Sequence, residues 1–113
     1  MRLEARKYLR DIQVAAERIE RFTRGKQFEH YLADEMLRSA VERQLSIIGE
    51  ALSRLDKDSP VVAAAIPDRG KIIAFRNILI HGYADVDDRI VWGVIENYLA
   101  SLRNAVEKLM ARP

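Results

Sequence analysis

The chain has 113 residues, of which 49% are hydrophobic and 32% charged, and its formal net charge is +2. This size and composition predict one folded, helix-rich domain over residues 1–113 and exclude a disordered chain. There is no cysteine, which excludes disulfides and thiolate metal sites, and no apolar run reaches the roughly 20 residues that a membrane span needs. We therefore expect a soluble cytoplasmic protein that does not enter a membrane.

The small net charge conceals an uneven distribution along the chain. Residues 1–27 carry eight Lys or Arg against four Asp or Glu, and residues 61–83 carry three against one. Residues 28–60 are acidic, with seven Asp or Glu against four Lys or Arg. A basic first helix and a basic later segment would suit a polyanion, but helices with mixed charges are more commonly solvated surface, which is what we expect here.

Apolar residues recur every three or four positions over residues 3–22, which predicts one face of a long helix. After a break at Gly25, residues 28–32 predict a short helical turn. Asp34 is a predicted N-cap for a second long helix that runs to about Leu55. The residues of this helix that we expect to face the core are Leu37, Val41, Leu45, Ile48, Leu52 and Leu55.

Gly49 lies inside this second helix, within the sequence IIGEAL. Glycine inside a helix costs about 1 kcal/mol relative to alanine. We therefore expect a neighbouring helix to pack closely against its bare backbone. For the adjacent Glu50 we expect a surface position, with pairing to a basic group near a functional site as the alternative.

The third main helix is predicted from Asp68 to His81, after a loop that ends at Pro60 and a short buried turn that ends at Pro67. Its apolar residues leave little polar surface, so we expect this helix to lie centrally in the bundle. Gly82 follows it and is predicted to end the helix in the left-handed conformation.

The last helix is predicted to run from its N-cap, Asp87, to the C-terminus, with Val86 and Val91 placed as a hydrophobic staple. The sequence contains no strand alternation and no internal repeat. The predicted fold is therefore all-α: an antiparallel up-and-down bundle of four main helices plus a short one.

The segment RNILIHGY, residues 76–83, concentrates polar residues in an otherwise apolar part of the chain. Arg76 and His81 are five residues apart, about 140° around a helix, so they flank one edge with Asn77 one turn below His81. A half-buried arginine needs an anion, either a carboxylate of its own protein or a phosphate from elsewhere. The spacing occurs by chance in many helices, so by itself it favours a structural ion pair or a helix C-cap.

An arginine and a histidine also supply two of the groups needed to cleave RNA without a metal. The imidazole would accept the proton of the 2′-hydroxyl, and the guanidinium would hold the phosphate as charge develops on it. The acid for the leaving 5′-oxygen is missing, because one chain offers no second histidine nearby. A twofold dimer with the motif helix at its interface would bring two arginines and two histidines to one cleft, one imidazole as base and the other as acid.

RNILIHGY resembles the R-x4-H-x-Y motif of the HepT-like toxin ribonucleases in the HEPN superfamily. The resemblance extends to AVERQLSIIGEAL, which is similar to the second-helix signature of that family, and to DVDDRIVW after the motif. It departs at Asp68, where the family has an aromatic residue. The resemblance implies an all-α HEPN-like bundle, a homodimer with a composite cleft, and metal-independent endoribonuclease activity without a cofactor. That activity would make the chain the toxin of a type VII toxin–antitoxin pair.

The resemblance also implies roles for single residues. Arg76 and His81 match the catalytic pair, and Asn77 matches the polar residue beside the arginine. Tyr83 matches the tyrosine to which the partner antitoxin, a minimal nucleotidyltransferase, transfers AMP from ATP. The adenylate would bring a phosphate and a base into the mouth of the cleft, where they would occupy the arginine and obstruct RNA.

Two other functions remain compatible with the sequence. The chain would be a non-catalytic helical partner if it mainly docks a nucleotidyltransferase and the motif serves that interface. A dimeric DNA- or RNA-binding bundle without chemistry is the third possibility, and the modest net charge argues against it. His30, between Glu29 and Tyr31, is expected to be a surface residue.

Overall fold

The computed structural model describes residues 1–82 and 86–112. Within these residues the backbone forms six helices and no strand, so the all-α prediction is confirmed. Four helices are long: α1 (Leu3–Thr23), α3 (Glu35–Asp58), α5 (Arg69–His81) and α6 (Asp88–Met110). Two are short: α2 (Phe28–Ala33) and α4 (Pro60–Ala63). The described residues thus form one short helix more than the sequence predicts, because α4 lies where the sequence predicts only a turn.

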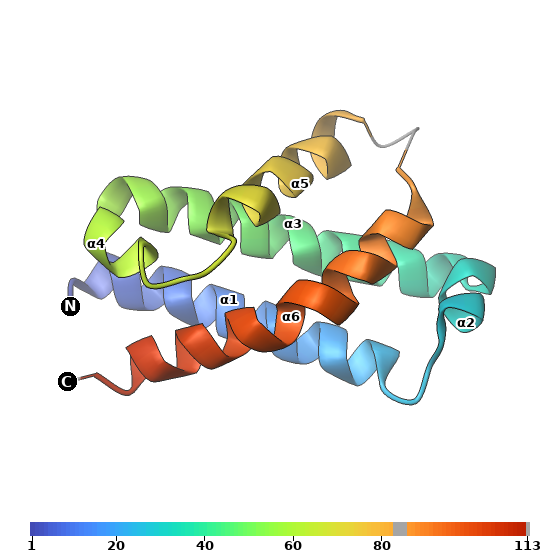
Figure 1. Cartoon of the computed structure of the whole chain (residues 1–113), viewed down its shortest axis with the longest axis horizontal. Coiled ribbons are helices and arrows are strands. Elements are labelled where there is room, and N and C mark those ends of the chain that lie inside the picture. Colours follow the sequence, from blue (N-terminus) through green and yellow to red (C-terminus); the bar gives the residue numbers. More distant parts are fainter. Residues whose placement is uncertain (83–85, 113) are drawn as a thin grey trace.

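The long helices alternate in direction along an elongated bundle of 43 × 29 × 19 Å (Figure 1). Helix α3 packs against α1, α2, α4 and α5, and α6 packs mainly against α1. Both chain termini lie at the same end of the bundle (Figure 1). None of the described helices is both long and apolar enough to cross a lipid bilayer.

The core follows the helical periodicity of the sequence. The six inward positions predicted for α3 are all buried. Helix α1 buries residues at the same three- and four-residue spacing: Ala5, Leu9, Ile12, Ala15, Ala16 and Ile19. Near one end of the bundle the buried ring of Tyr31 lies tilted against Trp92, with the ring centroids 5.3 Å apart. Burial of one large apolar side chain stabilises the folded state by about 1.5–3 kcal/mol, so these buried residues together hold the helices against one another.

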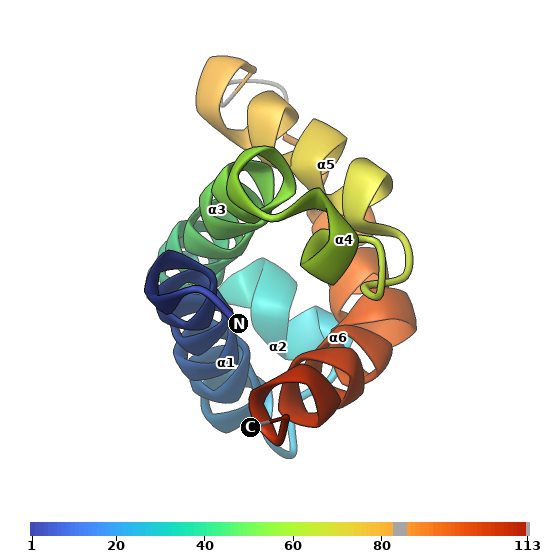
Figure 2. The ribbon, with the colours of Figure 1, turned by 90° about the vertical axis from the view of Figure 1, so that its left-hand side faces the viewer.

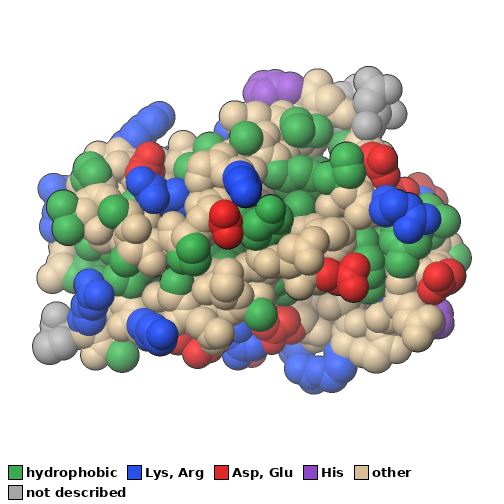
Figure 3. All heavy atoms as spheres, viewed as in Figure 1, with side chains coloured by type: hydrophobic (Ala, Val, Ile, Leu, Met, Phe, Trp, Pro, Cys, Tyr) green, Lys and Arg blue, Asp and Glu red, His purple; other side chains and the backbone are tan. Residues whose placement is uncertain are grey.

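The surface carries charges of both signs. On the face seen in Figure 3, Lys and Arg side chains are interspersed with Asp and Glu and with apolar side chains. Some charged side chains of the protein pair between helices, for example Arg38 with Asp88 at 3.8 Å and Arg69 with Asp56 at 3.1 Å. This face therefore has no large area of a single charge.

Two of the predicted helix starts are confirmed by their capping hydrogen bonds. The side chain of Asp34 accepts a hydrogen bond from the backbone N–H of Leu37 at 3.0 Å. The side chain of Asp87 accepts one from the backbone N–H of Arg89 at 2.9 Å. Each carboxylate satisfies a backbone donor that has no partner inside its helix.

The two ends of α5 differ from the prediction. The helix begins at Arg69, and Asp68 before it adopts the left-handed conformation, with φ of 58° and no side-chain capping bond. The left-handed end predicted at Gly82 is wrong, because its φ is −119°. The backbone N–H of Gly82 instead donates to the carbonyl of Ile78 at 2.8 Å, so an ordinary helical hydrogen bond closes the last turn.

The prediction that α5 lies centrally in the bundle is also wrong. Figure 2 shows α5 at the outer edge, beyond α3, which is the helix that it packs against most extensively. Ile72 and Leu79 are buried, but Ile78 and Ile80 remain 55% and 41% exposed. An apolar sequence shows that a helix can be buried, but it does not show how many neighbouring helices will cover it.

Gly49 lies where α3 meets α5, and the expectation of a close approach at this glycine is confirmed. A Cβ atom added to Gly49 would overlap the Cβ and Cγ atoms of Arg76. The two helices therefore lie closer together than any larger residue would permit, and this packing compensates the helix propensity that glycine loses.

Gly49→Ala should destabilise the protein because the Arg76 Cβ is fixed to its backbone, so α5 itself must move. Such overpacking costs about 1–3 kcal/mol, and the better helix propensity of alanine offsets only about 1 kcal/mol of it. Urea denaturation should show a lower free energy of unfolding. The matched control is Gly70→Ala, also in a helix, where an added Cβ meets nothing within 4 Å. A Gly49→Ala protein as stable as the Gly70→Ala protein would contradict the close approach.

Candidate active site

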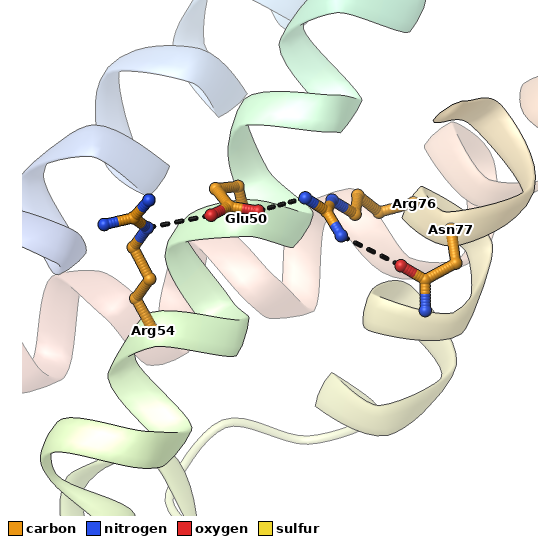
Figure 4. A network of polar contacts seen from close by, with 4 residues as sticks. All are labelled: Glu50, Arg54, Arg76 and Asn77. Atoms are coloured by element: carbon orange, nitrogen blue, oxygen red, sulfur yellow. Dashed lines mark hydrogen bonds and ion pairs between the residues drawn. The ribbon is translucent and has the colours of Figure 1, made fainter. Parts of the chain in front are cut away.

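Arg76 leaves α5 toward α3, where its guanidinium is held on two sides (Figure 4). Its Nη2 forms an ion pair with Oε2 of Glu50, and its Nη1 donates a hydrogen bond to Oδ1 of Asn77 at 2.9 Å. The side chain of Arg76 is 23% exposed. The carboxylate and the amide together fix the orientation of the guanidinium while part of it still reaches solvent.

Glu50 lies between two arginines, as Figure 4 shows. Its Oε1 accepts a hydrogen bond from Nε of Arg54 at 2.8 Å, one turn along α3, while its other oxygen pairs with Arg76. Glu50 lies at the surface as expected, with 39% of its side chain exposed, and it is also the partner of a basic group, which was the alternative. The carboxylate that Arg76 requires comes from the protein itself.

The net charge of Arg54, Glu50 and Arg76 together determines which kind of ligand these side chains attract. The pKa of the Glu50 carboxyl is lowered, chiefly by the hydrogen bond from Arg54; desolvation opposes this effect, and the charge of Arg76 adds a smaller lowering of its own. Two guanidinium groups and one carboxylate leave an excess of one positive charge. Among the described residues, the buried Nε of Arg76 has no hydrogen-bond partner. An anion that reaches Arg76 therefore meets uncompensated positive charge.

A groove of about 410 Å³ opens beside Arg76, between α1, α3 and α5. Its wall combines apolar side chains, such as Ile47 and Ile80, with the ring of Tyr8. Its charged lining residues are Lys7, Asp11, Arg43, Glu50, Arg54 and Arg76. Four cations against two carboxylates make the groove basic, which favours a negatively charged ligand.

His81 is the last residue of α5 and is exposed. It is not among the residues that line the groove. The structure thus brings Arg76 and Asn77 into direct contact but leaves His81 at the open end of the same helix. Tyr83, the expected site of modification, lies outside the described residues. His30 is exposed as expected, and its Nδ1 accepts a hydrogen bond from the backbone N–H of Gln27 at 2.8 Å, which caps α2.

The sequence alone did not single out Lys7, Arg43 and Arg54 as residues of this site. The sequence does indicate that three charged residues of α3 share one helix face, because residues 43, 50 and 54 follow at spacings of seven and four. The sequence does not indicate that α5 packs beside this face and brings Arg76 to it. Within residues 1–82 and 86–112, no three His, Cys, Asp or Glu side chains lie close enough together to hold a metal ion.

Glu50→Gln should make stability less dependent on pH. The folded pKa of Glu50 lies below its unfolded value of 4.5, so the carboxylate stabilises the fold above that pH, and its contribution disappears as the pH falls through the folded pKa. Wild type should therefore lose free energy of unfolding more steeply than Glu50→Gln between about pH 5 and pH 3 in urea titrations. Glu96→Gln, which changes an exposed carboxylate on α6, should keep the wild-type slope. Equal slopes for wild type and Glu50→Gln would show that the ion pair adds nothing.

Known proteins resemble the chain over nearly all of its length. A family model described as "Ribonuclease HepT-like" matches residues 12–109. A Thermococcus cleftensis protein named "Probable ribonuclease HepT" is 39% identical over 109 residues, which covers 96% of this chain and 98% of that protein. A Caldanaerobacter subterraneus protein named as a candidate RNase is 32% identical, with 95% of each chain covered. No solved structure matches the chain. The match to the family model, together with the all-α fold, shows that the chain belongs to the HepT-like ribonuclease family of the HEPN superfamily.

Proposed function

We propose that the chain is a metal-independent endoribonuclease in which Arg76 and His81 are the catalytic residues and Asn77 supports the arginine. The observation that carries this proposal is the guanidinium of Arg76, held between Glu50 and Asn77 at the edge of a basic, solvent-open groove. Membership of the HepT-like ribonuclease family and the names of the relatives support RNA as the substrate.

The proposed reaction is a transesterification that needs no water and no cofactor. The imidazole of His81 takes the proton of the ribose 2′-hydroxyl, and the 2′-oxygen forms a bond to phosphorus as the bond from phosphorus to the 5′-oxygen breaks. A second imidazole returns a proton to the leaving 5′-oxygen. The products are a 2′,3′-cyclic phosphate and a free 5′-hydroxyl. Arg76 binds the phosphate and stabilises the charge that develops on its oxygens.

We infer that the second imidazole comes from a second copy of the chain, in a homodimer of single-domain protomers. Helix α5 packs chiefly on α3 and leaves Ile78 and Ile80 exposed, so it offers apolar surface for a twofold contact. His81 is exposed at the end of the same helix. Such a contact would place both copies of the motif around one cleft, which explains why a single chain holds only one of the two acid–base groups.

The proposed biological role is that of the toxin of a type VII toxin–antitoxin pair. Tyr83 follows His81 by two positions in the sequence. In the proposed neutralisation its hydroxyl oxygen attacks the α-phosphate of ATP on a minimal nucleotidyltransferase, which leaves AMP on the tyrosine and releases pyrophosphate. The added phosphate and base would compete with RNA for Arg76.

A second candidate function is a helical partner of the nucleotidyltransferase without catalysis. The ion pair with Glu50 favours it, because this carboxylate satisfies the half-buried Arg76 without any nucleic acid. In that case the motif would hold α5 against α3 and shape the docking surface. The two functions differ in whether the purified protein cuts RNA.

His81→Ala should lower the rate of RNA cleavage by at least about 100-fold because it removes the proton-transfer group. Arg76→Ala should lower it by about 100- to 1000-fold because the phosphate loses its charged donor. The measurement is the cleavage of labelled RNA by protein purified without the partner, in the presence of EDTA. Arg76→Ala leaves Glu50 paired with Arg54, so no carboxylate loses all its partners.

Circular dichroism and molar mass in solution should show that both variants keep the fold and the dimer. Equal cleavage by wild type and His81→Ala would exclude the proposed mechanism, and loss of wild-type activity in EDTA would require a metal. A wild-type protein that leaves RNA intact but binds the nucleotidyltransferase tightly would establish the second function.

Incubation of the protein with ATP and the proposed nucleotidyltransferase partner should add mass in steps of one AMP and reduce RNA cleavage. Tyr83→Phe should prevent both effects while retaining the nuclease activity, since only the accepting hydroxyl is lost. Intact-protein mass spectrometry and the RNA cleavage assay measure the two effects. Addition of AMP to the Tyr83→Phe protein would place the modification on a different hydroxyl.

A further inference from the structure

We propose that the groove between α1, α3 and α5 binds the RNA strand on either side of the cleaved bond. In this inference Lys7 and Arg43 hold phosphates of neighbouring nucleotides, and Arg54 contributes from the far side of Glu50. The inference rests on the proposed ribonuclease function and adds the residues that bind the substrate beyond the scissile phosphate.

The groove carries positive charge that its own carboxylates do not neutralise. Arg54 and Arg76 share Glu50, so one of these two positive charges is neutralised. Lys7 and Arg43 are exposed and take part in no ion pair among the described residues. Asp11 offsets one of these two charges. The net excess over the whole groove is two positive charges, in a hollow that is open to solvent. A phosphate chain is the ligand class that such a groove fits best.

The cations of α3 lie on both sides of Arg76 along the helix axis. Arg43 precedes Glu50 by seven residues and Arg54 follows it by four, distances of about 10 Å and about 6 Å along the helix axis. Arg76 reaches α3 between them, where it packs on Gly49 and pairs with Glu50. A strand with its scissile phosphate on Arg76 would therefore meet a further cation in each direction along α3.

The wall of the groove combines cations with apolar and aromatic side chains. Lys7 and the partly buried ring of Tyr8 come from α1, across the groove from the arginines of α3. Aromatic rings and apolar side chains beside cations are typical of sites for single-stranded nucleic acid, because bases stack on them while phosphates contact the cations. This arrangement gives the basic first helix a role that the sequence alone did not assign.

The double variant Lys7→Ala/Arg43→Ala tests whether the groove binds RNA, without altering Arg76, Glu50 or Arg54. For a single-stranded RNA of many nucleotides, KM should rise about tenfold with little change in kcat, because only contacts outside the cleaved linkage are lost. The plot of log kcat/KM against log salt concentration should become less steep by about 1.4, since each phosphate contact contributes about 0.7 on single strands. For a dinucleotide substrate, the increase in KM should shrink to less than about twofold.

The matched control is Arg18→Ala/Lys108→Ala, which removes the same total charge from exposed positions outside the groove. It should keep the KM and the salt dependence of wild type within about twofold. The inference is overturned if the groove variant matches this control, or if its KM rises equally for the dinucleotide and the long RNA.

Direct binding separates this inference from the proposed function. Fluorescence anisotropy of a labelled RNA should show weaker binding to the groove variant than to wild type and to the control, and the same ranking should hold on a His81→Ala background. If wild type binds RNA through these residues but cuts none, the ribonuclease proposal is wrong and the groove is still an RNA-binding site. If wild type cuts RNA while Lys7→Ala/Arg43→Ala binds it unchanged, the groove is not the RNA-binding site and the ribonuclease proposal still holds.

Discussion

The contact between the bare backbone of Gly49 and the stem of Arg76 determines the geometry of the site. Because glycine lacks a Cβ, α5 approaches α3 closely enough for the Arg76 side chain to lie across the helix surface. The guanidinium then meets Glu50, which Arg54 already holds from the opposite side. The ion pair and the tight packing act together, so the glycine that weakens α3 as an isolated helix strengthens its contact with the neighbour.

The fold was largely predictable because the helices other than α5 have clear apolar faces, and because α3 and α6 begin at conventional N-caps. The regular spacing in α1 and α3, together with the caps at Asp34 and Asp87, located most helix boundaries within a few residues. Helix α5 is the exception, because its sequence is apolar on more than one side. The periodicity of apolar residues predicts which side chains favour burial, but not whether another helix of the same chain covers them. Ile78 and Ile80 stay exposed.

The site was predictable only in part, for a related reason. The motif places Arg76, Asn77 and His81 within six positions, so the sequence alone identifies them as candidates. The carboxylate of Glu50 lies 26 residues away from Arg76, and their pairing depends on how two helices cross. The cations of the groove are divided between α1 and α3 in the same way. Local sequence patterns identify reactive groups, whereas the groups that orient them come from tertiary packing.

The common location of the two termini has a practical consequence. Both ends of the chain leave the bundle on the side away from the last turn of α5 (Figure 1). An affinity tag or a fused reporter at either terminus would therefore be tethered far from His81. Protein immobilised through such a tag would keep this end of α5 directed toward the solution, where large ligands can approach it without steric hindrance from the support.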